Sequence, residues 1–335
     1  MMEKTESPGL DTEGFTKSGG GSAWKKFSFR ARSLGNLLKM GHCAPAVMKT
    51  ILEICGSEEE WPVKAVAGLP GGIGDTGFEC GGITSPLLLL GLRYGLRNSQ
   101  NGLPLIFSKG HDLFRKFVDR NGTPLCREIR GDNYRLTHCI KAVCLSPEIA
   151  ASVQSHESGD AIVGEQREAY ALLYSHLAGG GFHCAHQVFH RLGGVIPVDR
   201  ELLDASSGYL GGTLFKGMTC SAYAAGVMAL GLKMGEIEGS LPRVVRMIVL
   251  MKTGGDAFAD PVNKFNRIMN LGKSLAGWFT AEFGDTQCQA ITGCDFSALE
   301  DVRKYIETDR LAGCREVAEK VADKVLAMMS PVRSA

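Results

Sequence analysis

The chain repeats one stretch of its own sequence, and the repeat preserves glycines and a cysteine. The 28 residues from Gly68 to Gly95 match those from Gly208 to Gly235 without a gap, at a constant offset of 140. Nine of the 28 positions are identical, and six of these nine are glycine. Unrelated stretches of average composition would share only about one position in fifteen. The match therefore indicates a duplication, and the chain must fold as two related units.

The duplication extends outward on both sides and includes further cysteines. His42-Cys43-Ala44 recurs as His183-Cys184-Ala185, and Cys80 aligns with Cys220 inside the repeated stretch. Downstream, Cys126 aligns with Cys288, and Cys139 pairs more loosely with Cys314. The candidate site residues are therefore Cys43, Cys80, Cys126 and Cys139 in the first copy, and Cys184, Cys220, Cys288 and Cys314 in the second. Three cysteines have no counterpart: Cys55, Cys144 and Cys294.

Length and charge limit the class of protein. A chain of 335 residues can form two domains with cores of their own, and its net charge of +1 does not favour nucleic acid as a partner. No apolar run reaches the 18 or so residues of a membrane span, so no membrane insertion is expected. Residues 1–26 are polar and rich in Gly and Ser at their start, which predicts a flexible tail on a cytoplasmic protein.

Apolar residues recur at helical spacing along the ordered segments, and strand-like alternation is scarce. The patterns predict helices over 44–54, 84–94, 111–118, 222–234, 242–252, 260–270, 299–308 and 314–329. Two of them, Thr84–Tyr94 and Ala222–Met234, are apolar almost all round, which indicates buried central helices. The predicted fold is all-α, with two tandem helical-bundle repeats, Gly-rich loops and a flexible N-terminal tail.

The domain boundaries follow from the repeat. The first four-cysteine unit is predicted at residues 27–156 and the second at 167–331, separated by a polar, aperiodic segment. The third cysteine follows the second by 68 positions in the second copy, against 46 in the first. This predicts an insertion near residues 240–262, containing an apolar helix that either covers a core or meets a partner.

Eleven cysteines in a predicted cytoplasmic chain need an explanation, because stable disulfides are disfavoured there. Burial as a small apolar side chain suits Cys55 and Cys144, but it does not explain why four cysteines stay in register in both copies. No CxxC spacing occurs, so the four thiols of each copy can meet only if separate elements bring them together. Cysteines at helix starts are expected to have lowered thiol pKa values. Glycines before Cys80 and Cys220 would let the backbone approach the sulfur atoms.

These cysteines and glycines give the chain a resemblance to a known family. It resembles two tandem copies of the redox-active domain named for its C-GCAxxG-C-C pattern, from about residue 30 to 155 and from about 167 to 330. The resemblance implies that the eight paired cysteines are the hallmark residues. Ser85 and Ala225 replace the final glycine of the central motif. It further implies a helical fold and a role in electron transfer or thiol redox chemistry.

Three kinds of chemistry remain open at the eight cysteines. An iron-sulfur cluster in each repeat would make the protein an electron carrier or an oxidoreductase, with a redox protein as partner. A metal-free dithiol/disulfide pair is the first alternative. A structural zinc ion in a helical interaction module is the second. A homo-oligomer is compatible with each.

Overall fold

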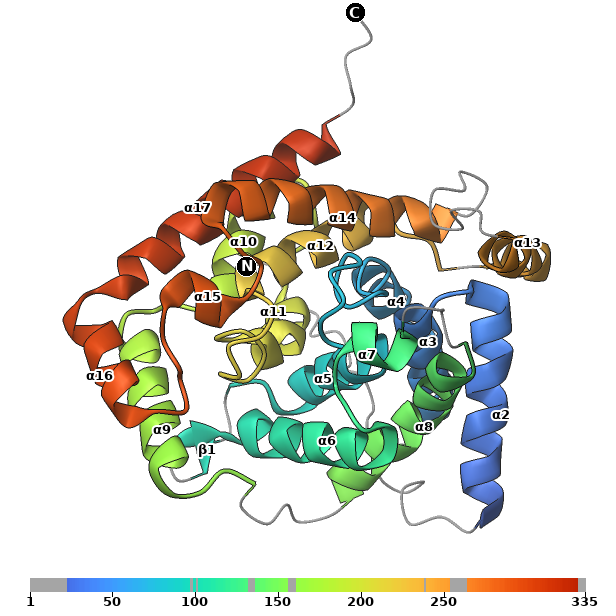
Figure 1. Cartoon of the computed structure of the whole chain (residues 1–335), viewed down its shortest axis with the longest axis horizontal. Coiled ribbons are helices and arrows are strands. Elements are labelled where there is room, and N and C mark those ends of the chain that lie inside the picture. The colour runs from blue at the N-terminus through green and yellow to red at the C-terminus, as the bar shows by residue number, and fades with distance from the viewer. Residues whose placement is uncertain are drawn as a thin grey trace, which may run out of the picture.

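The computed structural model describes residues 23–96, 99–100, 102–131, 136–155, 161–237, 239–253 and 264–330, and these are almost entirely helical (Figure 1). The elements of the first copy are α2 (Ala23–Met40), α3 (Cys43–Cys55), α4 (Trp61–Ala65), α5 (Gly81–Tyr94), α6 (Leu105–Asn121), α7 (Cys126–Arg130) and α8 (Leu136–Ser155). A minimal antiparallel pair, β1 (Ser99–Gln100) and β2 (Leu103–Pro104), precedes α6. The all-α prediction is confirmed.

The second copy follows the same order with additions. Its elements are α9 (Gly164–Gly179), α10 (Cys184–Leu192), α11 (Arg200–Ser206), the 3-10 turn η1 (Ser207–Tyr209), α12 (Ser221–Met234), α13 (Leu241–Lys252), α14 (Lys264–Phe283), α15 (Cys288–Thr292), α16 (Leu299–Glu307) and α17 (Arg310–Met329). By sequence alignment α3, α5, α7 and α8 correspond to α10, α12, α15 and α17. Helix α13 is the predicted helix of the insertion, and residues 254–263 lie outside the described residues.

Several helices extend beyond their predicted bounds. Helix α6 begins six residues earlier than predicted and ends three later, since Ile106, Phe107 and Phe117 continue its buried stripe. Helix α14 runs on to Phe283, and residues 260–263 of its predicted start are not described. Helix α5 begins at Gly81, so Pro86 lies inside the helix rather than in its first turn. Most of the predicted tail precedes the described residues, which begin with α2.

The two central helices are buried as predicted. All residues of α5 from Gly81 to Gly91 are buried, and so are all residues of α12 from Ser221 to Gly231. One hydrophobic core runs through both copies and includes side chains from α3, α5, α10 and α12. The repeats therefore share a core, and each stabilises the other through burial of apolar surface.

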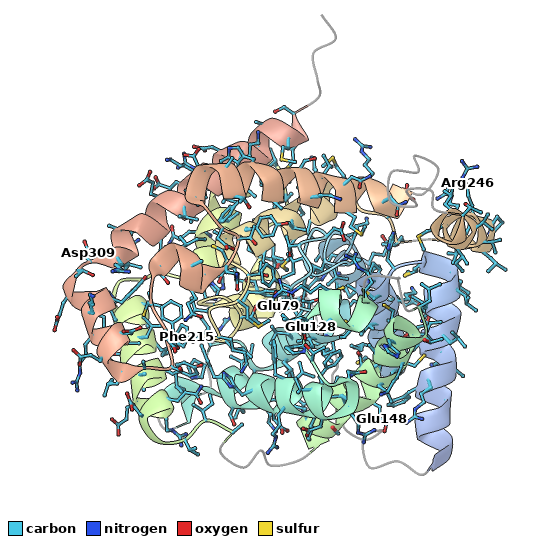
Figure 2. The ribbon with its side chains drawn as sticks, in the orientation of Figure 1. Glu79, Glu128, Glu148, Phe215, Arg246 and Asp309 are labelled. Carbon is cyan, nitrogen blue, oxygen red and sulfur yellow. The ribbon has the colours of Figure 1, made fainter. Side chains whose placement is uncertain are left out.

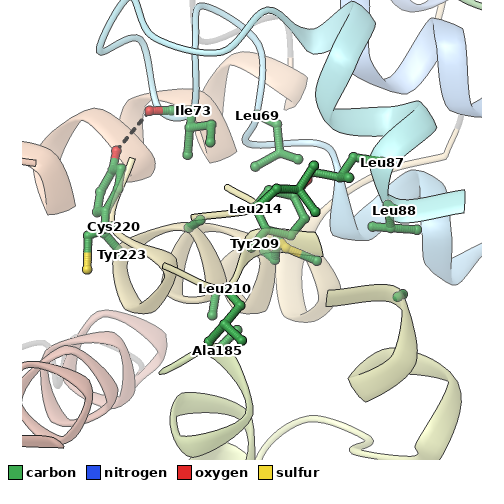
Figure 3. Close-up of a cluster of buried hydrophobic side chains, with 14 of the residues drawn as sticks. Leu69, Ile73, Leu87, Leu88, Ala185, Tyr209, Leu210, Leu214, Cys220 and Tyr223 are labelled. Carbon is green, nitrogen blue, oxygen red and sulfur yellow. Dashed lines mark hydrogen bonds between the residues drawn. The ribbon is translucent and has the colours of Figure 1, made fainter. Parts of the chain in front are cut away.

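The copies meet through reciprocal contacts between equivalent elements, part of which Figure 3 shows. A Cβ placed on Gly68 would lie 2.5 Å from Val227, and one on its counterpart Gly208 would lie 2.6 Å from Leu87, the counterpart of Val227. Gly91 likewise approaches the backbone carbonyl oxygen of Ala205. The expectation of close backbone approach to sulfur concerned the loop glycines just before Cys80 and Cys220, whereas Gly68 and Gly91 permit close approach of the other repeat.

A buried carboxylate of the first copy, Glu79, contacts the second copy; Figure 2 labels it near the middle of the molecule. Glu79 is fully buried, and its Oε1 accepts hydrogen bonds from Thr213 Oγ1 at 2.6 Å and from the backbone N–H of Thr219 at 3.2 Å. Its Oε2 accepts from Thr219 Oγ1 at 2.5 Å. Tyr223 of the second copy also donates its hydroxyl to the carbonyl of Ile73 at 3.0 Å (Figure 3). The interface is therefore polar at its centre and satisfied there by hydrogen bonds.

Among the described helices, none combines the length and apolar character that a membrane span requires.

Candidate functional site

The four cysteines of the first copy come from four helices and converge. Cys43 is the first residue of α3, Cys80 caps the start of α5, Cys126 is the first residue of α7, and Cys139 lies on α8. Burial is the main cause that raises the pKa of Cys43, Cys80 and Cys126. The charge of Cys139 adds to the shift of all three, and that of Cys43 adds to the shift of Cys80 and Cys126. The four sulfur atoms are therefore within electrostatic reach of one another.

The second copy reproduces this arrangement. Cys184 begins α10, Cys220 precedes α12, Cys288 begins α15 and Cys314 lies on α17. The pKa of Cys288 is raised first by burial and then by the charges of Cys220, Cys184 and Cys314. Cys139 and Cys314, whose sequence alignment is the weakest of the four, thus occupy equivalent positions in the two copies. We call the two groups of four the first and the second cysteine site.

A fifth cysteine, Cys294, lies beside the second cysteine site. It is buried, and its thiolate charge adds to the causes that raise the pKa of Cys288. Burial itself raises the pKa of Cys294 to about 12, and the charges of Asp301 and Cys314 also contribute. Sequence reasoning set Cys294 aside because the first copy has no cysteine at the corresponding position, so the repeat carried no signal for it.

Short backbone links fix the second and third cysteines of each site together. In the first copy the N–H of Cys80 donates to the carbonyl of Pro124 at 2.9 Å, and that of Cys126 donates to Phe78 at 2.6 Å. In the second copy the N–H of Cys220 donates to Thr286 at 2.8 Å and that of Cys288 to Met218 at 2.6 Å. The loop before each central helix is thus tied to the start of the short helix that carries the third cysteine.

The loops before Cys80 and Cys220 are left-handed turns. Five consecutive residues, 71–75 in one copy and 211–215 in the other, have φ between 58° and 85°. Two of the first five and three of the second five are not glycine, and each such residue costs about 1–2 kcal/mol in this conformation. This winding brings the N–H groups of Gly71 and Gly211 to the sulfur atoms of Cys43 and Cys184. The expectation that glycine lets the backbone approach the thiols is met at these two positions.

The glycine at the start of α5 also makes room for sulfur. A Cβ on Gly81 would lie 2.5 Å from the Sγ of Cys43. Nearby, Ser85 stands where the C-GCAxxG-C-C pattern has the final glycine of its central motif. Its hydroxyl donates to the carbonyl of Ala44 at 2.8 Å, which ties α5 to the first turn of α3. The departure from the motif thus adds a hydrogen bond between the two helices without displacing Cys80.

Burial determines the protonation of the thiols, and the expectation of lowered pKa values is wrong. Loss of hydration raises the pKa of Cys43 to about 11, although N–H groups of Ala44, Gly71 and Gly81 lower it in part. Burial likewise raises the pKa of Cys220 to about 11 and that of Cys80 well above the usual value. Helix starts favour the thiolate, but the cost of an uncompensated buried charge is larger. At neutral pH the sites therefore hold thiols unless a bound cation compensates the charge.

The histidines next to the first cysteines have structural roles. His42 is buried, and its Nε2 pairs with Asn266 Oδ1 at 2.7 Å. His183 stacks on His186 with ring centroids 3.8 Å apart, and His186 Nε2 pairs with the carbonyl of Leu203 at 2.8 Å. Burial lowers the pKa of His42 and of His186 to about 4, so both rings are neutral at pH 7.

The second cysteine site has one hydroxyl contact of its own. Tyr305 Oη lies 3.3 Å from Cys314 Sγ, and burial raises the pKa of Tyr305. In the first cysteine site the charge of Arg130 partly offsets the burial that raises the pKa of Cys139. The two sites thus have corresponding cysteines but different surroundings.

The spacing of the donor atoms limits what each cysteine site can hold. Within the described ranges no three His, Cys, Asp or Glu side chains form a group that could hold a single metal ion. In an iron-sulfur cluster the thiolates are distributed over different iron atoms, so their sulfur atoms stand further apart than the ligands of one ion. Convergence of four thiols without single-ion spacing is compatible with that arrangement. Backbone N–H groups beside the sulfur atoms would stabilise their charge.

Comparison with known proteins agrees with the duplication. The family described as "Putative redox-active protein (C_GCAxxG_C_C)" matches residues 41–153 and again residues 182–328. The two matches cover most of the chain and include all eight paired cysteines. No curated protein and no solved structure matches the chain.

Proposed function

The chain belongs to the C_GCAxxG_C_C family of redox-active proteins, and from this premise we propose that it transfers electrons through an iron-sulfur cluster in each cysteine site. The observation that carries the proposal is the convergence, in both copies, of four thiols from four separate helices, of which the second and third of each site are buried and the first and fourth are partly buried. Cys43, Cys80, Cys126 and Cys139 would hold one cluster, and Cys184, Cys220, Cys288 and Cys314 the other.

Ionisation of the thiols would require a positive charge at each site. Four neighbouring thiolates would repel one another, and burial raises the pKa of each of the four thiols at both sites. Iron supplies the positive charge that lets such thiols ionise, and it would provide one-electron redox chemistry when bound. The chain itself contributes the N–H groups of its left-handed loops, which stabilise sulfur charge, and its apolar surroundings, which limit access of water.

The metal-free dithiol reading is the second candidate. Thiol exchange proceeds through the thiolate, and thiols with raised pKa values are largely protonated at neutral pH. A zinc ion would need four sulfur atoms around one point. The dithiol reading therefore requires a thiol to ionise despite its raised pKa, and the zinc reading requires the sulfur atoms to come closer together.

The decisive experiment is anaerobic purification of the full chain after expression with iron supplied, followed by absorption spectroscopy and assays for iron, sulfide, zinc and thiols. We expect visible absorbance with iron and sulfide in similar amounts. Cys80→Ser and Cys220→Ser should each lose about half of the iron, and the double variant nearly all of it. Cys55→Ser, outside both sites, is the matched control and should keep its iron.

A folded but colourless protein without iron would overturn the proposal. If its thiol count then fell reversibly by an even number on oxidation, the dithiol reading would stand. Bound zinc, with unfolding on chelation, would establish the structural alternative.

A further inference from the structure

An apolar pocket lies against the first cysteine site and has a volume of about 150 Å³. Cys43, Cys126 and Cys139 form part of its wall. The opposite walls come from helices α2, α8, α13 and α14 and consist of aliphatic side chains: Leu34, Leu37, Leu38, Leu136, Ile140, Val143, Val244, Met247, Ile248 and Met269. Three of the four thiols of this site therefore face one apolar space.

The helix of the second-copy insertion completes this pocket. Helix α13 packs against α2 of the first copy, as Figure 1 shows at the right of the molecule. Val244 and Met247 are only 4% and 5% exposed and point to the pocket, whereas the neighbouring Val245 is 50% exposed. The insertion thus supplies a wall for the site of the other repeat.

The second cysteine site has different surroundings. Helix α9 occupies the position in sequence that α2 occupies in the first copy, but it packs against α16. The pocket beside Cys314 has the charged side chains of Glu282, Arg310, Glu316 and Lys320 on its wall, next to the apolar Phe283, Ile291 and Val317. The apolar pocket beside the first cysteine site depends on residues of α2 and α13 and does not follow from the repeated motif.

The polar side chains on the pocket wall are already paired. Arg130 Nη1 bonds to Asp75 Oδ1 at 2.9 Å, and His42 pairs with Asn266. An occupant with a charge would lose hydration against aliphatic walls without a partner to replace it. A dry apolar cavity of about 150 Å³ is large enough for benzene.

We propose that this pocket binds a neutral, apolar molecule of about the size of one aromatic ring, held against Cys43, Cys126 and Cys139. Contact with the aliphatic side chains of α2, α8, α13 and α14 provides the affinity. Cys43, Cys126 and Cys139 are also proposed cluster ligands, so this proposal requires the pocket to stay open beside the cluster, and the titration is run on the chain with and without iron. Binding by the iron-free chain alone would mean that the cluster fills the pocket and would overturn the proposal.

The test is a fluorine NMR titration of the full chain with fluorobenzene. Wild type should bind it saturably. Val244→Phe fills the pocket and should weaken binding at least tenfold, whereas Val245→Phe, one residue along the same helix, should stay within about twofold of wild type. Ile140→Phe, at a partly exposed position on the wall of the same pocket, should also weaken binding. This variant replaces Val244→Phe in the test if circular dichroism shows that Val244→Phe is unfolded.

Absence of saturable binding in wild type would overturn the proposal. So would equal binding in wild type and a folded pocket-filling variant, or equal weakening by Val244→Phe and Val245→Phe.

Discussion

The buried contact between Glu79 and Thr219 should be the most sensitive polar contact between the repeats. Thr219→Val keeps the shape of the side chain and removes one hydroxyl donor from a fully buried carboxylate. Hydrogen bonds to charged groups contribute about 1.5–3 kcal/mol each, so we expect the free energy of unfolding to fall by about 2 kcal/mol. Glu79 keeps its other two donors, from Thr213 and from the backbone of Thr219, which limits the loss.

The assay is urea unfolding followed by circular dichroism, with wild type, Thr219→Val, Glu79→Gln and the double variant. Since one core spans both copies, we expect a single transition. In the Glu79→Gln background the same threonine substitution should cost only about 1 kcal/mol, because the remaining hydrogen bond is neutral. The cycle should therefore show a coupling energy of about 1 kcal/mol.

The exposed Thr253, whose hydroxyl bonds within its own helix, provides the control. Thr253→Val should change stability by less than about 0.5 kcal/mol. The reasoning would be refuted by a Thr219→Val effect no larger than this control, by additive single effects, or by two separate transitions for the two repeats.

Three further predictions concern one buried histidine and two glycines. Burial and then the charge of Lys216 lower the pKa of His111 to about 3. The unfolded chain, in which His111 has an ordinary pKa near 6.5, therefore binds the proton first, and His111 alone should lower the free energy of unfolding by about 2 kcal/mol between pH 7 and pH 5, in addition to the contributions of the buried His42 and His186. His111→Gln, measured by urea unfolding at several pH values, should reduce that slope, and an unchanged slope would contradict the assignment. Gly91→Ala should destabilise by about 1–3 kcal/mol, because the added methyl meets the carbonyl of Ala205. Gly277→Ala, with open space at a helical position, should raise the thermal midpoint through helix propensity.

The duplication made the sites predictable and left the interface between the repeats hidden. Four cysteines in register pointed to two equivalent sites, and apolar periodicity located the main helices. Glu79 carried no comparable signal, because its counterpart in the repeat is Thr219. Its role depends on which residues of the other copy lie opposite, and only the tertiary structure determines that.

Glycine illustrates a second limit of the sequence. Gly71 and Gly91 are equally preserved between the copies, yet Gly71 adopts a positive φ beside a sulfur atom and Gly91 admits a neighbouring helix end. The thiol pKa values were mispredicted for a related reason. A cysteine at a helix start can be read from sequence, but the depth of its burial cannot, and here burial is the larger effect.

The reciprocal contacts between the copies have the form that two identical subunits make across a twofold axis, where a residue pair appears twice with its partners exchanged. A single copy would present the same apolar face to a second molecule of itself. When the two halves are joined in one chain, each half can change its sequence independently, whereas in a symmetric dimer every substitution appears on both sides of the interface. The helix inserted in the second half forms a wall of the pocket beside the first cysteine site. A pair of identical subunits could not restrict this specialisation to one side.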